Sequence, residues 1–172
     1  MAGRIAAGRL PVNLAAMDRM AVLAAYARRT GVPVIHVHHD DPDPASPFQR
    51  GAAGGAPMAC AAPLAGETVR WKQQSSAFSG TGLDAQLRGL GTDRVIVAGA
   101  GAAFCVTSTV RAASGLGYQV VLPVDALLGF DLPAHDGGRI DAATVQRVTL
   151  SLLGADFAQL VPVDQLAGVA LA

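Results

Sequence analysis

The chain has 172 residues, of which 51% are hydrophobic and 15% charged, and its formal net charge is zero. This composition excludes a disordered chain, and the balanced charge gives no sign of nucleic acid or an anionic membrane as a partner. No apolar run has the length of a membrane span, and the first residues lack a secretory apolar core. Two cysteines, Cys60 and Cys105, form no disulfide framework. We therefore expect a cytoplasmic protein with a single domain over residues 1–172.

The first predicted elements are a helix and a buried strand. Apolar residues recur at helical spacing from Leu14 to Arg29, and Asn13 is a suitable N-cap. Gly31 and Pro33 end this helix, and the apolar run 32–37 predicts a buried strand.

A polar loop follows that strand. It contains His36, His38, His39, Asp40, Asp41 and Asp43. Imidazoles and carboxylates at this spacing could bind a metal, but no second cluster elsewhere in the sequence would complete the ligand shell. We expect no metal and interpret the stretch as a polar loop at a strand end, with His38 and Phe48 as candidate pocket residues. The Gly- and Ala-rich stretch 49–63 predicts an irregular crossover that covers a pocket.

The rest of the chain alternates strands and helices. Thr68–Lys72 is a predicted strand that places Lys72, the only lysine, at its carboxyl end. Further predicted strands are 94–98, 119–123 and about 157–161, and predicted helices are 83–90 and about 141–153. This order predicts an α/β fold with a parallel sheet and helices on both faces. Ligands of such sheets lie beyond the carboxyl ends of the strands, where His38, Lys72, Cys105 and Asp125 all occur.

Cys105 stands in the stretch RVIVAGAGAAFCVTSTVR, residues 94–111. Gly99 and Gly101 break the strand, and a helix is expected from Phe104, with Val106, Thr109, Val110 and Ala113 on its inner face. A cysteine at such a strand-to-helix turn is placed as a nucleophile, because the free N–H groups there favour a thiolate and can hold an oxyanion.

Two other interpretations of this stretch stay open. Cys105 is also compatible with a small buried residue of a packed β–α unit. Gly99 and Gly101 also begin a dinucleotide fingerprint, with Asp125 near the position of a ribose-binding acid. Phe104 occupies the third glycine position of that fingerprint, which disfavours nucleotide binding.

Several segments together resemble the isochorismatase-like cysteine hydrolase family. They are SPF (46–48), GETVRWKQQSSAFSGTGLDAQL (66–87), AGAGAAFCVTSTVRAASGLGYQVVLPVDA (98–126), His135 and FAQLVPVDQL (157–166). The resemblance implies a three-layer α/β/α fold with a six-stranded parallel sheet and an Asp–Lys–Cys triad. By position, Cys105 would be the nucleophile and Lys72 the triad lysine. A cis peptide near Ala100–Gly101 would lie beside the oxyanion hole, so Ala100, Gly101 and Cys105 are its candidate residues.

The resemblance also narrows the activity. Members with the cysteine resemble amidases, so Cys105 favours hydrolysis of a C–N bond in a small molecule over vinyl-ether cleavage. The metal-binding motif of some members is not matched here, and no cofactor is expected. Phe48 and Phe78 are candidates to shape the pocket, and the family implies a homo-oligomer.

One part of the family pattern has no counterpart. The triad aspartate of the family ends a first strand, shortly before a segment like GRLPV, which is 8–12 here and preceded only by MAGRIAA. We therefore expect the first strand and its aspartate to be missing, and hydrolase activity to be low or absent. The alternative function is that of a non-catalytic relative that binds ligands or forms oligomers.

Overall fold

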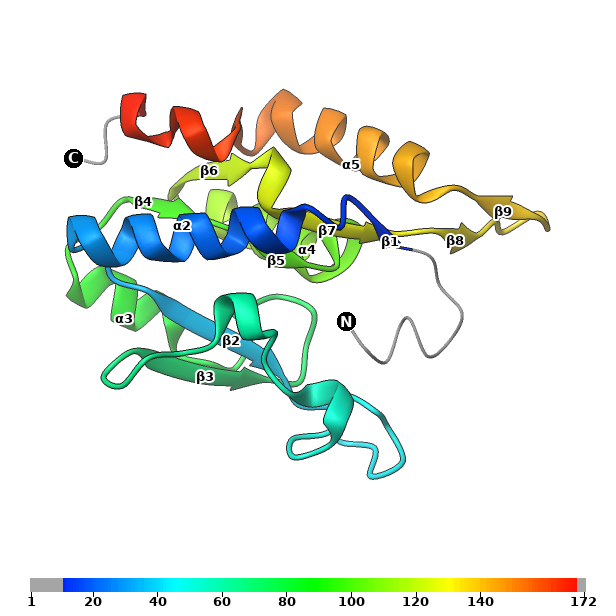
Figure 1. Ribbon diagram of the computed structural model, residues 1–172, viewed down its shortest axis with the longest axis horizontal. Coiled ribbons are helices and arrows are strands. Elements are labelled where there is room, and N and C mark those ends of the chain that lie inside the picture. The colour runs from blue at the N-terminus through cyan, green and yellow to red at the C-terminus, as the bar shows by residue number, and fades with distance from the viewer. Residues whose placement is uncertain (1–10, 170–172) are drawn as a thin grey trace.

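The structure, a computed structural model, describes residues 11–169 (Figure 1). Its helices are α2 (Ala16–Thr30), α3 (Leu83–Gly89), α4 (Thr107–Gly115) and α5 (Ala142–Asp156). Its strands are β1 (Pro11–Val12), β2 (Ile35–His39), β3 (Thr68–Lys72), β4 (Arg94–Ile96), β5 (Gly99–Ala100), β6 (Gln119–Pro123), β7 (Leu127–Phe130), β8 (Leu132–Pro133), β9 (Arg139–Ile140) and β10 (Gln159–Val161). Short 3₁₀ turns cover 53–55, 59–61, 124–126 and 163–168.

The start of α2 differs from the prediction. Asn13 does not cap this helix; Ala15 occupies the N-cap position without a side-chain hydrogen bond. Asn13 instead has a positive φ of 58°, and its side-chain amide donates to the backbone oxygen of Asp125 over 3.2 Å. Asparagine tolerates this left-handed conformation better than most residues do, so Asn13 joins the first turn to the segment after β6.

The strands form mostly parallel sheets, which confirms the predicted α/β class. β6 pairs in parallel with both β4 and β10, and β5 pairs in parallel with β7. β2 and β3 form a separate parallel pair, which Figure 1 shows below the other strands. Antiparallel pairing occurs between β1 and β7 and in the hairpin β8–β9, which projects from one end of the molecule (Figure 1).

Within residues 11–169, β2 is hydrogen-bonded only to β3, and β4 only to β6. Each of these strands therefore has one edge without a described partner. The segment before Pro11, where we predicted that the first strand of the family is missing, lies outside the described residues, and that expectation stays a prediction.

Helices cover both faces of the central strands, which gives three layers. Val120 and Leu122 of β6 pack in a buried cluster with residues of α3 and α4. Val121, the intervening residue, belongs to a second cluster with Ala16 and Met20 of α2. Because side chains alternate along a strand, an uninterrupted apolar strand such as β6 needs apolar partners on both faces. The inner face predicted for the helix after Cys105 is buried, at Val106, Thr109, Val110 and Ala113.

Candidate active site

The backbone around Cys105 is a tight turn from a strand into a helix. β5 leads into Gly101, whose φ of 84° suits glycine, and a π-helical turn over Ala102–Val106 then continues into α4. The backbone N–H groups of Phe104 and Val106 donate to the Gly101 oxygen over 2.8 and 3.3 Å. π-Helical turns occur mostly as single turns and are frequent at functional sites. This turn holds Cys105, which is partly buried, beyond the carboxyl end of β5.

The structure corrects one expectation about this turn. No cis peptide bond occurs within the described part of the chain, so the cis bond expected near Ala100–Gly101 is not there. Gly101 turns the chain through its left-handed conformation instead, and its N–H donates to the Leu128 oxygen of β7 over 3.1 Å.

Lys72 lies directly beside the cysteine. It is the last residue of β3, is only 6% exposed, and its Nζ lies 3.3 Å from Cys105 Sγ. Nζ also donates to the Gln74 backbone oxygen over 2.8 Å and lies 3.5 Å from His39 Nδ1. An ammonium carries three protons, and these three neighbours match them. A positive charge at this distance from sulfur attracts the negative charge of a thiolate.

His39 reaches the site through the pairing of β2 with β3. In this parallel pair His39 lies opposite Lys72, and His38 lies opposite Trp71. Neighbouring residues of a strand point to opposite faces, so His38 faces away from Lys72. Its ring packs against Trp71 at a centroid distance of 5.2 Å, and burial, with a smaller effect of His36, lowers its pKa. The structure thus places His39, and not the predicted His38, beside Lys72.

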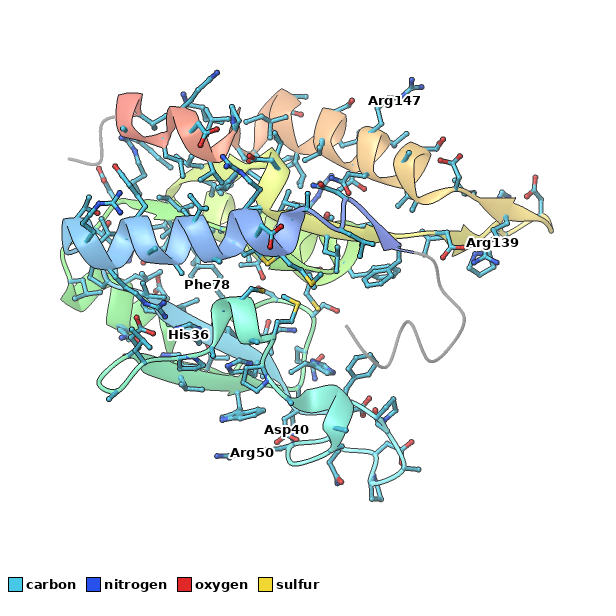
Figure 2. All side chains as sticks on the ribbon, viewed as in Figure 1. His36, Asp40, Arg50, Phe78, Arg139 and Arg147 are labelled. Atoms are coloured by element: carbon cyan, nitrogen blue, oxygen red, sulfur yellow. The ribbon has the colours of Figure 1, made fainter. Side chains whose placement is uncertain are left out.

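Phe48 lies next to this group in the loop after β2. The edge of its ring faces the His39 ring, with centroids 6.5 Å apart and planes at 78°. The loop is held by its own hydrogen bonds: Ser46 Oγ donates to Asp41 over 2.8 Å, and the Arg50 N–H donates to Asp40 over 2.9 Å. Figure 2 shows the side chains of Asp40 and Arg50 close together in this loop.

Two further candidates from the sequence are held in other surroundings. Asp125 accepts hydrogen bonds from Arg19 Nε over 2.7 Å and from the Val163 N–H over 2.8 Å, joining α2 to the C-terminal turn. Phe78 is partly buried, stacks on Tyr118 at 5.9 Å and packs against the cluster beneath α3 and α4. Both contacts stabilise the fold.

A second polar cluster anchors the segment that precedes β3. Arg28 of α2 donates to both oxygens of Glu67 over 2.8 and 2.9 Å. The Leu64 N–H and His36 Nε2 each lie 2.8 Å from the same carboxylate. The Arg28 hydrogen bonds, followed by that of the Leu64 N–H, hold the pKa of Glu67 well below its ordinary value. The cluster therefore fixes the chain just before the strand that carries Lys72.

Replacing Glu67 with glutamine is expected to lower the stability of the fold at neutral pH. A carboxylate with a depressed pKa stabilises the folded state above its unfolded pKa, about 4.3 for glutamate, and this contribution is lost as pH falls toward the folded pKa. Urea unfolding at pH 7 should therefore show a lower midpoint for Glu67→Gln. The difference from the unchanged protein should shrink below about pH 4. Asp136→Asn, at an exposed position, is the control, and its urea midpoint should equal that of the unchanged protein at both pH values. A difference independent of pH would contradict this account.

The described residues offer neither a cluster of metal ligands nor a helix suited to a membrane. The described residues contain no group of three His, Cys, Asp or Glu side chains arranged to hold a metal ion. The rings of His36 and His38 are stacked at a centroid distance of 6.2 Å, but His36 binds Glu67 and His38 packs on Trp71. None of the helices between residues 11 and 169 combines the length and apolarity that crossing a bilayer requires.

The chain is similar to known proteins in both sequence and fold. The family model described as the isochorismatase domain matches residues 8–151. A solved structure of a putative hydrolase of that family from Chromobacterium violaceum superposes with a TM-score of 0.89 at 34% identity, covering 92% of this chain and 82% of that chain.

Two relatives carry named activities. A streptothricin hydrolase from Streptomyces noursei is 33% identical over 157 residues, covering 89% of this chain and 55% of that protein. A maleamate amidohydrolase from Pseudomonas putida is 31% identical over 126 residues, covering 65% of this chain and 59% of that protein.

Proposed function

Because the chain belongs to the isochorismatase family, we propose that it is a cysteine-dependent hydrolase that cleaves an amide-type C–N bond of a small molecule. The observation that carries this proposal is the contact between Cys105 Sγ and the buried Lys72 Nζ at 3.3 Å. The named activity of the maleamate amidohydrolase, which is similar to this chain, supports an amide as the substrate class.

In this proposal Cys105 attacks the carbonyl carbon of the substrate as a thiolate. Lys72 stabilises the negative charge on sulfur, and its burial strengthens that attraction because little water screens it. The oxyanion that forms on the substrate would be held by backbone N–H groups of the turn from Ala100 to Cys105. Those of Gly101 and Phe104 already donate to the Leu128 and Gly101 oxygens, so other N–H groups of the turn, such as that of Cys105, would take this role. Phe48 would contribute an apolar wall beside His39.

The alternative, a non-catalytic relative, is favoured by one observation. Among residues 11–169, no carboxylate forms an ion pair with Lys72. Amide hydrolysis needs a group that delivers a proton to the leaving amine, and a triad aspartate would be that group. Without one, the protein would have low turnover or would only bind ligands at this site.

Alkylation with iodoacetamide at neutral pH, followed by mass spectrometry of both cysteines, separates the two functions. Burial raises the pKa of Cys60, so that thiol should react slowly. We expect Cys105 to react at least about tenfold faster, and turnover of maleamate or other small primary amides to disappear in step with its modification. Equally slow reaction of both cysteines, with no turnover of any amide, would reject the hydrolase and leave the binding protein.

A further inference from the structure

His39 is linked to Cys105 through Lys72, which contacts both residues. Cys105 Sγ lies 3.3 Å from Lys72 Nζ, and Lys72 Nζ lies 3.5 Å from His39 Nδ1. His39 and Lys72 are the last residues of two parallel strands and are paired directly across the sheet. Backbone pairing therefore fixes the spacing of the two side chains, and the Asp40 N–H continues it by donating to the Lys72 oxygen over 2.8 Å.

The carboxylates of the surrounding segments are engaged in other contacts. Asp40 accepts from the Arg50 N–H, and Asp41 accepts from Ser46 Oγ and the Asp43 N–H. Asp125 is bound to Arg19 and the Val163 N–H. The imidazole of His39 is thus a group in contact with Lys72 that can both take up and release a proton.

We propose that His39 stores the proton of the reaction and exchanges it with the reacting atoms through Lys72. This proposal rests on the proposed hydrolase function. His39 acts through the lysine, because Nδ1 faces Nζ and Nζ faces the sulfur. The imidazole would carry out the proton transfer that the family pattern assigns to the triad aspartate.

The first half of the reaction forms a thioester. The thiol proton of Cys105 moves to Lys72 Nζ while a proton of the ammonium moves to His39 Nδ1. The thiolate then bonds to the carbonyl carbon. The C–N bond breaks as the stored proton returns from His39 through Lys72 to the nitrogen of the leaving amine. The products are an acylated Cys105 and a free amine.

The second half uses water and the same route. The oxygen of a water molecule bonds to the thioester carbon, and one water proton passes through Lys72 to His39. The C–S bond then breaks, the carboxylic acid leaves, and the stored proton returns to the sulfur of Cys105. The site ends in its starting protonation state.

The charges of Lys72, of a Cys105 thiolate and of Asp41 would act on a protonated His39 ring in different directions. Lys72 opposes the positive charge of an imidazolium, whereas the thiolate and Asp41 favour it. Asp41 lies close enough for its pKa to be lowered in part by the charge of His39, after the larger effects of the hydrogen bonds from Ser46 and the Asp43 N–H. The Phe48 ring packs edge-on against the imidazole and limits its rotation.

The test compares His39→Asn with His39→Ala on two substrates of one acid: its primary amide and its p-nitrophenyl ester. Asparagine keeps an oxygen that can accept from Lys72, but it cannot store a proton. Nitrophenolate leaves without protonation, whereas an amine does not. We expect both variants to lose about 10²- to 10³-fold in kcat on the amide. On the ester, the first pre-steady-state release of nitrophenolate should slow only a few-fold, because it precedes the water step that the two substrates share.

His38→Asn is the matched control, since His38 precedes His39 in the strand and faces away from Lys72. It should keep both rates within about twofold. Amide turnover retained in His39→Asn would overturn the proton store. An equal loss in amide turnover and in the first release of nitrophenolate would overturn it as well. If Cys105→Ala retains amide turnover, the proposed function itself fails, whatever His39 does.

A measurement without turnover keeps the inference testable. The midpoint of the His39 ring titration, followed by NMR, should fall when Cys105 is alkylated, because the thiolate no longer favours the imidazolium. The midpoint of His38 should stay the same. An unchanged His39 midpoint would show that the ring and the thiol do not share a proton.

Discussion

Replacing Cys105 with alanine is expected to lower amide turnover by at least about 10³-fold while the protein stays folded. The loss is expected because alanine removes the sulfur that would form the bond to the carbonyl carbon. Folding should be retained because Cys105 is only partly buried and its turn is held by backbone hydrogen bonds to Gly101. Steady-state hydrolysis of a small amide, with circular dichroism to check folding, measures both parts.

Cys60→Ala is the control for this experiment. Cys60 packs against the cluster of α2 and the C-terminal turn, outside the contacts of Lys72. Its replacement should leave kcat and KM within about twofold. Cys105→Ser should retain a small part of the activity at most, since a hydroxyl is a weaker nucleophile than a thiolate. Full activity in Cys105→Ala would reject the hydrolase proposal.

The sequence predicted where Lys72 and Cys105, the two central groups of the proposed site, lie in the fold. Lys72 was expected at the carboxyl end of a strand over Thr68–Lys72, and β3 has these bounds. Cys105 was expected at a strand-to-helix turn because Gly99 and Gly101 interrupt an apolar strand, and the turn is found there. Both predictions depend on local sequence patterns, and the elements that those patterns predict are present in the structure.

His39 could not be found in the same way. The apolar run of β2 ends at Val37, so the predicted strand covered 32–37, whereas pairing with β3 extends the strand over Ile35–His39. The polar residues gain strand structure from their neighbour rather than from their own preference. Once the register of β2 against β3 is known, His39 is paired with Lys72 and His38 is not. The sequence alone does not give that register.

β7 and Asn13 also differ from what the sequence predicted. β7 was missed because it follows β6 after a single turn at 124–126, with no helical crossover between them. Asn13 was expected to cap α2, but its amide is used by the backbone oxygens of Asp125 and Leu127, which are more than a hundred residues away in the sequence. Contacts at such separations have no signature in a local pattern.

Replacing Lys72 with methionine is the second substitution with a large expected effect. Methionine has nearly the length of lysine and no charge, so it fills the buried space while removing the ammonium beside Cys105. We expect amide turnover to fall by about 10²- to 10³-fold, because the negative charge on sulfur loses its partner and the route to His39 is broken. Steady-state kinetics on the amide used for Cys105→Ala measures this loss.

The same substitution should leave the fold at least as stable as before. A buried ammonium without a carboxylate partner among residues 11–169 costs solvation free energy, which an apolar side chain does not. The Gln74 oxygen, at an exposed residue, can bind water once Nζ is gone. Lys72→Arg is the control for charge: its planar guanidinium keeps the charge but does not reproduce the three contacts of Nζ, so activity should stay low. A methionine variant that is inactive because it melts at a much lower temperature would contradict this account. A stable, inactive variant would show that Lys72 is kept for chemistry at the expense of stability.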